Sequence, residues 1–402
     1  MVSLRPFHPV YFTKNHEATV APPFDSIPAN METVLKENEF NITHLTLPEK
    51  NCLLDGNKTI YQWLQDGVIR KMDEEVVIVV KQSFTLDGKK LCRTGMISLV
   101  DIFPDDGCIK PHERTFPSKV EERKKVLDSI ETQLEPIFFV ADNDHLEDAL
   151  TKITDTREPS FRFLDVENVH NSVYFVKGVE SRELVELMNT DTVLVADGHH
   201  RLEASKMLAK NSAGEIRKFW SSIMAYITSV NSEGLKVRGI HRVIKKTINL
   251  DNFLESINER MQILGTSATS DSELIEIYYK GRLFTINLKP PPDSNQTFST
   301  YLSPVHMLNQ LIFKEILGFS ETDIEGAIEY IHSVEEAKRQ VDSGEGQIAF
   351  LMPSWNKNEL FKLVLEEGFL PQKSTYFYPK VCSGIAMNTL INNTNVPETF
   401  ST

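Results

Sequence analysis

Apolar and polar residues alternate in several short runs of the chain, which is the pattern of half-buried β-strands. Two such runs, EEVVIVVKQSF at 74–84 and RTGMISLVDIF at 93–103, flank the sequence TLDGKK. Asp-Gly between alternating runs predicts a tight β-hairpin. Before this hairpin, TIYQWLQDGVI at 59–69 has the spacing of a helix. The first hundred residues therefore predict a region of mixed helix and strand.

From about residue 106 onward, predicted strands alternate with predicted helices. The run SKVEERKKVLDSIETQLE places Val120, Leu127, Ile130 and Leu134 near one helical face. Further helices are expected over SRELVELMN (181–189) and RLEASKMLAK (201–210), and strands over PIFFVAD (136–142), SVYFVKG (172–178), VLVAD (193–197) and SSIMAYITSV (221–230). This alternation predicts a mixed α/β layer over residues 106–246.

The last part of the chain continues the mixture of helices and strands. Ser303 can cap a helix over 304–317 whose first residue is Pro304. Strands are expected over 282–288 and 347–352, and further helices over 334–344 and from Leu360 to Gly368. The fold class is therefore α/β in the mixed α+β sense, in three parts: an N-terminal region (1–105), a central core (106–246) and a C-terminal region (247–402).

Charge and cysteine usage restrict the function classes. The 402 residues include 43 Lys and Arg against 57 Asp and Glu, a formal charge of −14, which disfavours binding to nucleic acid or to an anionic membrane. No apolar run approaches the ~20 residues that span a bilayer. The four cysteines are scattered and indicate free thiols in a reducing compartment, so a cytoplasmic location is expected: Cys52, Cys92, Cys108 and Cys382.

The stretch VLVADGHHRLEAS, from Val193 to Ser205, combines a strand, a glycine turn and the start of a helix. The N–H groups at such a helix start attract an anion, and Gly198 lets the backbone approach it. His199, His200 and Arg201 add further donors, which favours a phosphate site. Two alternatives remain open: Asp197 as a simple helix cap, or a metal site that uses Asp197, His199 and Glu203.

Three further stretches carry cationic or acid–base groups. In KPHERTF, Glu113 lies between His112 and Arg114 before a predicted helix, and a positioned carboxylate can act as a general base. RGIHRVIKK contains His241 and Arg242, and PQKSTYFYPK contains Lys373, Ser374, Thr375 and Lys380. Separate cationic islands in an acidic protein suggest one focused anion pocket, although each stretch alone is also compatible with a solvated surface.

Five of these motifs, VAPPFD, PHER, ADGHHR, GIHR and PQKSTYFYPK, occur together in this order. In this the chain resembles a family in the ParB/sulfiredoxin-like superfamily that includes free-serine kinases, both short ADP-dependent forms and long pyrophosphate-dependent forms. The resemblance implies a ParB/sulfiredoxin-like catalytic core. It also implies phosphorylation of free L-serine to O-phospho-L-serine, a precursor for cysteine synthesis, with pyrophosphate, ADP or ATP as donor and Mg²⁺ as cofactor.

The resemblance also assigns roles to residues. Glu113 would accept the proton of the serine hydroxyl, and Asp197 would orient the substrate or a Mg²⁺ ion. The remaining matched residues would contact the donor phosphates: Gly198, His199, His200, Arg201, His241, Arg242, Lys373, Ser374 and Thr375. A rival function is a nucleotide-binding, ParB-like switch or partner-binding module without kinase activity. The sequence gives no oligomeric state.

Overall fold

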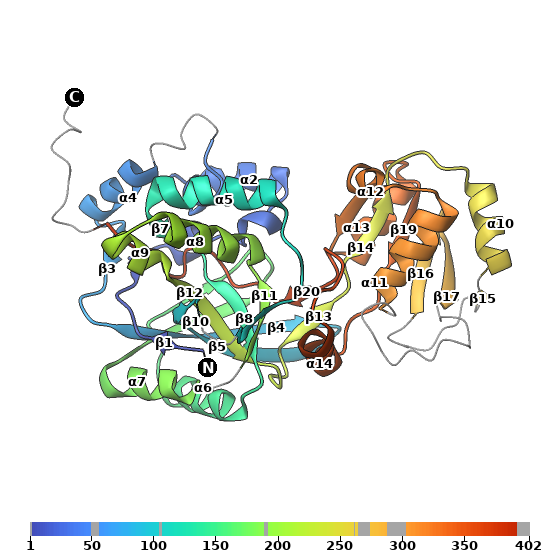
Figure 1. Cartoon of the computed structure of the whole chain (residues 1–402). Helices are drawn as coiled ribbons and strands as arrows, with labels where there is room; N and C mark the ends of the chain where they lie inside the picture. The colour runs from blue at the N-terminus through green and yellow to red at the C-terminus, as the bar shows by residue number, and fades with distance from the viewer. Residues whose placement is uncertain are drawn as a thin grey trace. The chain divides into compact units, whose positions relative to one another are not determined.

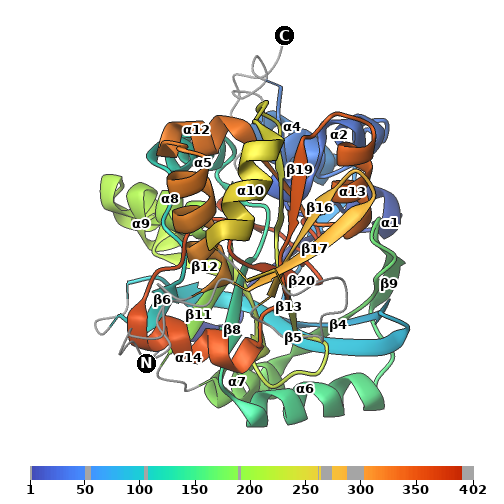
Figure 2. The same cartoon turned by 90° about the vertical axis from the view of Figure 1, so that its right-hand side faces the viewer.

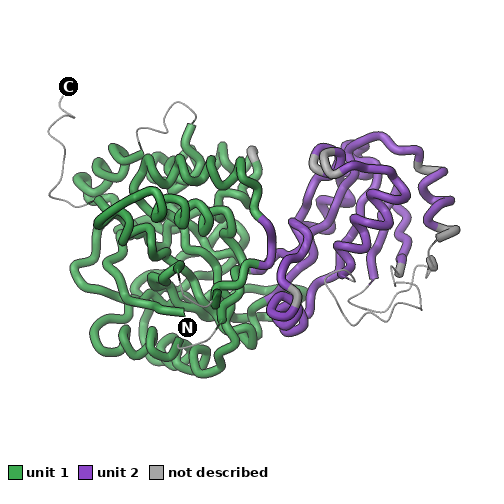
Figure 3. Tube along the Cα trace, in the orientation of Figure 1, with its two compact units in different colours: residues 1–111, 115–235, 379–402 green, residues 112–114, 236–378 purple. Residues whose placement is uncertain are grey.

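The computed structural model describes residues 2–49, 56–103, 107–188, 192–260, 262–263, 274–287 and 303–391. The chain forms two compact units (Figure 3): unit 1 holds 1–111, 115–235 and 379–402, and unit 2 holds 112–114 and 236–378. Residues 112–114 thus belong to unit 2, although unit 1 continues on both sides of them. The domain boundaries expected at 105/106 and 246/247 stay a prediction. The two compact units divide the chain at other positions.

A mixed sheet of nine strands is the centre of unit 1. Its strand order is β6 (Ile109–Pro111), β11 (Val193–Asp197), β8 (Ile137–Ala141), β12 (Ser222–Ser229), β5 (Lys89–Asp101), β4 (Val76–Leu86), β10 (His170–Lys177) and β9 (Phe161–Leu164), and β1 (Leu4–Arg5) also pairs with β5. β6 is parallel to β11 and β8 is parallel to β12, whereas the other pairs are antiparallel.

The hairpin between β4 and β5 confirms the prediction from Asp-Gly. Asp87 and Gly88 have φ angles of 51° and 74°, and the two-residue type I′ turn needs positive φ at both positions. Residues 76–80 of β4 and 95–100 of β5 are buried, as central strands covered on both faces should be.

Helices cover both faces of this sheet (Figure 1, Figure 2): α5 (Pro117–Ile130) and α8 (His199–Asn211) on one face, α6 (Asp144–Thr156) and α7 (Gly178–Leu187) on the other. The shorter elements of unit 1 are β2 (Val10–Phe12), α1 (His16–Thr19), η1 (Phe24–Ser26), α2 (Ala29–Lys36), α3 (Thr43–Thr46), α4 (Gly56–Gln65), β3 (Ile69–Lys71), β7 (Thr132–Gln133), α9 (Gly214–Trp220) and β21 (Asn388–Thr389). The fold of unit 1 is thus three-layered. Apolar residues of the sheet pack against α6 and α7 on one face and against Leu202 of α8 on the other, and α8 packs in turn on α5.

Unit 2 has a six-stranded sheet with its own apolar core around Phe253, Phe313 and Phe350. The strand order is β15 (Gln262–Ile263), β17 (Arg282–Asn287), β16 (Leu274–Tyr279), β19 (Ile348–Leu351), β14 (His241–Ile244) and β18 (Ile328–Ile331). A separate pair joins β13 (Lys236–Arg238) to β20 (Tyr376–Tyr378). The helices are α10 (Leu250–Arg260), α11 (Pro304–Met307), α12 (Glu321–Ala327), α13 (Val334–Asp342) and α14 (Lys357–Glu367).

The helix predicted over 304–317 begins as expected and then changes type. The Ser303 hydroxyl accepts a hydrogen bond from the His306 N–H at 3.2 Å, which is the predicted cap. From Leu308 to Ile316 the backbone forms a π-helix, whose wider turn the residue pattern does not distinguish from an α-helix. The mixed α+β class is confirmed in both units.

Two other expectations concern the compartment. Cys92, Cys108 and Cys382 form no disulfide, and Cys52 lies outside the described residues. Within the described ranges, no helix combines the length and the apolar character that crossing a bilayer demands.

Candidate functional site

Asp197 is the last residue of β11, and its side chain ends in a buried ion-pair cluster of unit 1. Oδ2 accepts a hydrogen bond from Arg201 at 2.9 Å, and Oδ1 accepts one from the Nζ of Lys380. Burial opposes ionisation of Asp197, but the positive charges of Lys380 and Arg201 outweigh it and lower the pKa to about 2. Both carboxylate oxygens of Asp197 therefore already have cationic partners.

Gly198 makes the turn from β11 into α8 possible. Its φ of 92° lies in the left-handed region, and a Cβ at this position would approach the Arg201 guanidinium at 3.1 Å and Ile137 at 3.3 Å. The glycine thus has a structural reason that is independent of any ligand: the chain must turn tightly while Arg201 folds back beneath it.

Arg201 and His200 both make side-chain contacts with other residues of unit 1. The Arg201 guanidinium is buried, donates to the carbonyl of Pro136 at 2.9 Å and lies 3.5 Å from a carboxylate oxygen of Glu135. His200 accepts a hydrogen bond from the Phe116 N–H at 3.1 Å through Nε2 and stacks on the Phe116 ring. Arg201 therefore positions Asp197, and His200 joins the start of α8 to the start of α5.

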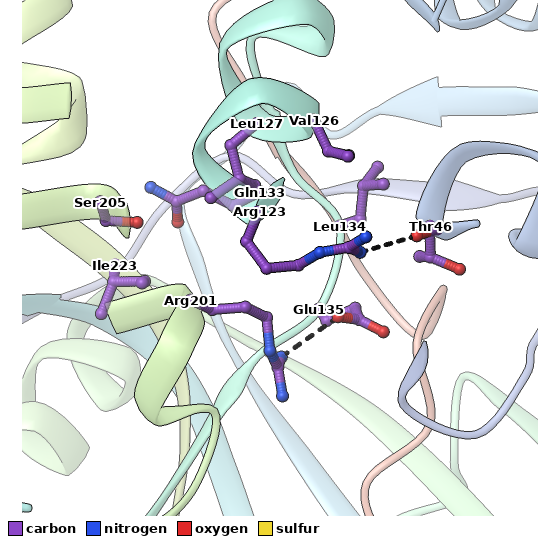
Figure 4. Close-up of a pocket in the computed structure, with 10 residues that line it drawn as sticks. All are labelled: Thr46, Arg123, Val126, Leu127, Gln133, Leu134, Glu135, Arg201, Ser205 and Ile223. Carbon is purple, nitrogen blue, oxygen red and sulfur yellow. Dashed lines mark hydrogen bonds and ion pairs between the residues drawn. The ribbon is translucent and has the colours of Figure 1, made fainter. Parts of the chain in front are cut away.

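A cavity of about 30 Å³ lies between α5 and α8 (Figure 4), with room for one or two water molecules. The guanidinium groups of Arg123 and Arg201 extend into it, and Glu135 lies beside Arg201. Four buried atoms of its lining, Thr46 Oγ1, Arg123 Nε, Arg201 Nε and Ser205 Oγ, have no hydrogen-bond partner among the described residues. Ordered water would satisfy such groups, so this cavity is best explained as a hydrated part of the scaffold.

Glu113 is the centre of a second cluster, formed entirely within unit 2. Its carboxylate accepts two backbone hydrogen bonds, from Lys373 N–H to Oε2 at 3.3 Å and from Ser374 N–H to Oε1 at 3.2 Å. The side chain keeps 18 % of its surface exposed. The structure thus brings the PHER and PQKST motifs together, although about 260 residues separate them in the chain.

His112 and Thr375 strengthen the same junction. Nε2 of the buried His112 lies 2.7 Å from Thr375 Oγ1 and 3.7 Å from Glu113 Oε1. The His112 carbonyl accepts from the Leu370 N–H at 2.7 Å. Segment 112–114 is therefore fixed along the segment 370–375 by both backbone and side-chain bonds.

His241 and Arg242 lie at the start of β14, and their buried side chains support this cluster. The Arg242 guanidinium is fully buried and donates to the carbonyl of Lys373 at 2.8 Å, and burial lowers its pKa to about 10. His241 Nδ1 accepts from the Met352 N–H at 3.0 Å, and burial together with the charges of Arg238 and Arg242 lowers the His241 pKa to about 4. A neutral, hydrogen-bonded His241 is a structural residue in this arrangement, and Arg242 holds the loop that contacts Glu113.

The sequence reasoning missed three partners of these residues. Lys380 was noted only as a cation in its motif, whereas it forms an ion pair with Asp197. Glu135, the counter-ion of Arg201, stands in no motif. The backbone amides of Lys373 and Ser374 contact Glu113, whereas the motif draws attention to their side chains.

The described residues contain no evident binding site for a metal ion. No group of three or more His, Cys, Asp or Glu side chains in the described ranges could hold one. Each oxygen of Asp197 already accepts a hydrogen bond from a cation, Arg201 or Lys380, and these positive charges disfavour Mg²⁺ beside it. Mg²⁺ commonly binds through substrate phosphates with few protein ligands, so it would have to come with a phosphate donor.

Comparison with known proteins gives the family. Residues 4–322 match the family described as "Protein of unknown function (DUF1015)". The chain belongs to this family. None of the curated proteins matches this DUF1015 member.

Solved structures that match this DUF1015 protein have low sequence identity to it. A free serine kinase in complex with AMP is 15 % identical over 72 % of this chain and 92 % of its own, with a TM-score of 0.40. A conserved hypothetical protein from Pyrococcus furiosus is 16 % identical over 72 % and 94 %, with a TM-score of 0.38. SbnI with a C-terminal truncation, from Staphylococcus aureus, is 10 % identical over 71 % and 85 %, with a TM-score of 0.40. At TM-scores of this size the likeness supports no conclusion about function.

Proposed function

We propose that this DUF1015 protein is a small-molecule kinase that phosphorylates free L-serine to O-phospho-L-serine. The observation that carries the proposal is the carboxylate of Glu113, which is partly exposed and accepts hydrogen bonds from two backbone N–H groups beside His112. A carboxylate placed in this way can take the proton of an attacking hydroxyl. The five motifs in their common order support serine as the substrate.

The proposed reaction is a direct phosphoryl transfer. The serine Oγ attacks the terminal phosphorus of the donor, its proton passes to Glu113, and the bond from that phosphorus to the bridging oxygen breaks. The leaving group is inorganic phosphate from pyrophosphate, AMP from ADP, or ADP from ATP. Such a transfer depends on positioning and charge neutralisation more than on covalent chemistry by the protein.

The start of α8 is a second candidate phosphate site, within unit 1, where the turn at Gly198 precedes the N-terminal amides of a 13-residue helix. His199 stands at the first position of this helix and can add a donor. Arg201 and Lys380 would act indirectly, because they neutralise Asp197 at the base of the turn. The long-form resemblance favours pyrophosphate, and Mg²⁺ is expected as a partner of the donor phosphates.

Phosphorus NMR tests the proposal directly. The protein is incubated with L-serine and Mg²⁺ and, in separate samples, with pyrophosphate, ADP or ATP. We expect the phosphoserine resonance with at least one donor, strongest with pyrophosphate. Absence of phosphoserine with all three donors would overturn the kinase proposal. Nucleotide binding without any phosphoserine would favour the ParB-like switch instead.

A further inference from the structure

The segment Pro371–Thr375 of unit 2 holds the Glu113 carboxylate through its main chain. Both contacts are backbone N–H groups of consecutive residues, Lys373 and Ser374, and each reaches a different oxygen of the carboxylate. Two adjacent amides that converge on one anion form the concavity that proteins use for phosphates and other oxyanions. Here the anion is a side chain of the protein itself.

The backbone of this segment has an unfavourable conformation at Lys373, whose amide contacts Glu113. Lys373 has a φ of 58°, in the left-handed region that non-glycine residues seldom adopt. Such a conformation is unfavourable and persists only where surrounding contacts enforce it. Arg242 binds the Lys373 carbonyl at 2.8 Å, and Trp355 Nε1 binds the Ser374 carbonyl at 2.9 Å. The Ser374 hydroxyl donates to the Pro371 carbonyl, so the direction of both amides is fixed from several sides.

The Glu113 carboxylate, by contrast, is held weakly enough to leave. Its two hydrogen bonds measure 3.2 and 3.3 Å, at or beyond the long end of the range of about 2.7–3.2 Å that is usual for N–H···O bonds. Its side chain remains partly exposed, and rotation about its own bonds would free the amides without any movement of the backbone. A phosphate presents pairs of oxygens much as a carboxylate does, and carries more charge.

We propose that the amides of Lys373 and Ser374 form an oxyanion site for a phosphate group, which the Glu113 carboxylate occupies until phosphate displaces it. If the proposed kinase function holds, phosphate binding at this site releases the carboxylate to accept the serine proton. The base would then become available only when a donor is bound, which limits unproductive chemistry. The site itself uses main-chain donors, so the identity of the side chain at 373 matters less than its backbone angle.

Calorimetric titration of the full chain with pyrophosphate and with inorganic phosphate, in the absence of serine, tests the site. We expect Glu113→Ala to bind both about tenfold more tightly than the wild type, because it removes an internal competitor that fills most of the site. Glu113→Gln should bind with intermediate affinity, since its amide group satisfies only one of the two N–H donors. Glu366→Ala removes an exposed carboxylate of the same unit and controls for net charge; it should leave the affinity unchanged.

Two spectroscopic readouts place the binding at this segment. With selective ¹⁵N labelling of lysine and serine, the amide resonances of Lys373 and Ser374 should shift when pyrophosphate is added, and should shift in Glu113→Ala without any ligand. Pyrophosphate should also change the tryptophan fluorescence of the wild type, and Trp355→Phe should abolish that change, because the indole is bonded to the Ser374 carbonyl.

The outcomes separate this proposal from the kinase proposal. Tighter phosphate binding in Glu113→Ala with the amide shifts supports the oxyanion site even if no donor yields phosphoserine. Equal or weaker binding in Glu113→Ala, or no phosphate binding in any variant, overturns it even if the protein proves to be a serine kinase.

Discussion

Asp197 in unit 1 and Glu113 in unit 2 are two carboxylates held in opposite ways. Asp197 is buried and bonded to the side chains of two cations, with Arg201 at 2.9 Å. Glu113 is partly exposed and bonded to two neutral backbone amides at 3.2–3.3 Å. A buried carboxylate between cations would leave uncompensated charge if it lost a partner, so it does not easily exchange partners, whereas a partly exposed one on amides can leave them. The chemistry is therefore expected at Glu113, and Asp197 is expected to hold the glycine turn in place.

The largest expected effect is on turnover at Glu113. Glu113→Gln keeps the shape of the side chain but removes the base, so serine phosphorylation should fall by about 10²–10⁴-fold. Phosphoserine formation over time measures the loss. Glu345→Gln, at an exposed glutamate of the same unit paired with Arg339, is the matched control and should retain full turnover. Equal rates for wild type and Glu113→Gln would show that the base lies elsewhere.

Removing a cation from the unit 1 cluster should affect stability instead. Arg201→Met leaves Asp197 and Glu135 buried without their shared counter-ion, and the free energy of unfolding should fall by about 3–5 kcal/mol. Urea unfolding measures the change. Arg339→Met breaks an exposed ion pair and should lower the free energy of unfolding far less. If both variants lose stability equally, the contrast between buried and exposed clusters is wrong.

Acid should weaken the same cluster in a defined range of pH. The pKa of Asp197 is about 2 in the folded protein and about 3.9 for an ordinary Asp, so its ionised form stabilises the fold above about pH 4. This contribution to the free energy of unfolding is on the order of 2–3 kcal/mol, and it is lost as the pH falls from about 4 toward 2. In urea unfolding at a series of pH values, Asp197→Asn should therefore lose less stability than the wild type between pH 4 and pH 2. Parallel curves would contradict the assignment.

The smallest of these effects concerns the turn itself. Gly198→Ala places a Cβ about 3 Å from the Arg201 guanidinium at a φ of 92°, and should cost about 1–3 kcal/mol of unfolding free energy. Gly88→Ala, at a hairpin position where a Cβ would meet nothing within 4 Å, isolates the cost of positive φ alone. Thermal unfolding of the two variants compares them, and the excess at Gly198 measures the close approach of Arg201. An equal loss in both would mean that this approach adds nothing.

Local rules explain which parts of the fold the sequence predicts. The Asp87-Gly88 hairpin and the Ser303 cap follow from the backbone preferences of a few adjacent residues. Helix α6 was missed, although Asn143 caps it and Leu146, Leu150 and Ile153 form its buried face. The change to π-helix at Leu308 has no comparable local signal in the sequence.

The candidate site divides in the same way. Residue types make Glu113 and the turn at 197–201 candidates, and the family resemblance gives them their expected roles. The sequence could not find Lys380 as the partner of Asp197, since only the folded chain brings the two together. The amides that hold Glu113 carry no side-chain signature at all, because any residue with the backbone angle of Lys373 could supply them.

Residues 112–114 belong to unit 2, and this limits how the chain can be divided into fragments. The fragment 236–378 would contain the amides of Lys373 and Ser374 but not the carboxylate they bind, and the fragment 1–235 would contain the carboxylate without the amides. No single cut separates the two units with this cluster intact. Truncation near residue 235 would thus dismantle the candidate site, and it would also remove Lys380 and the buried Met387 from unit 1.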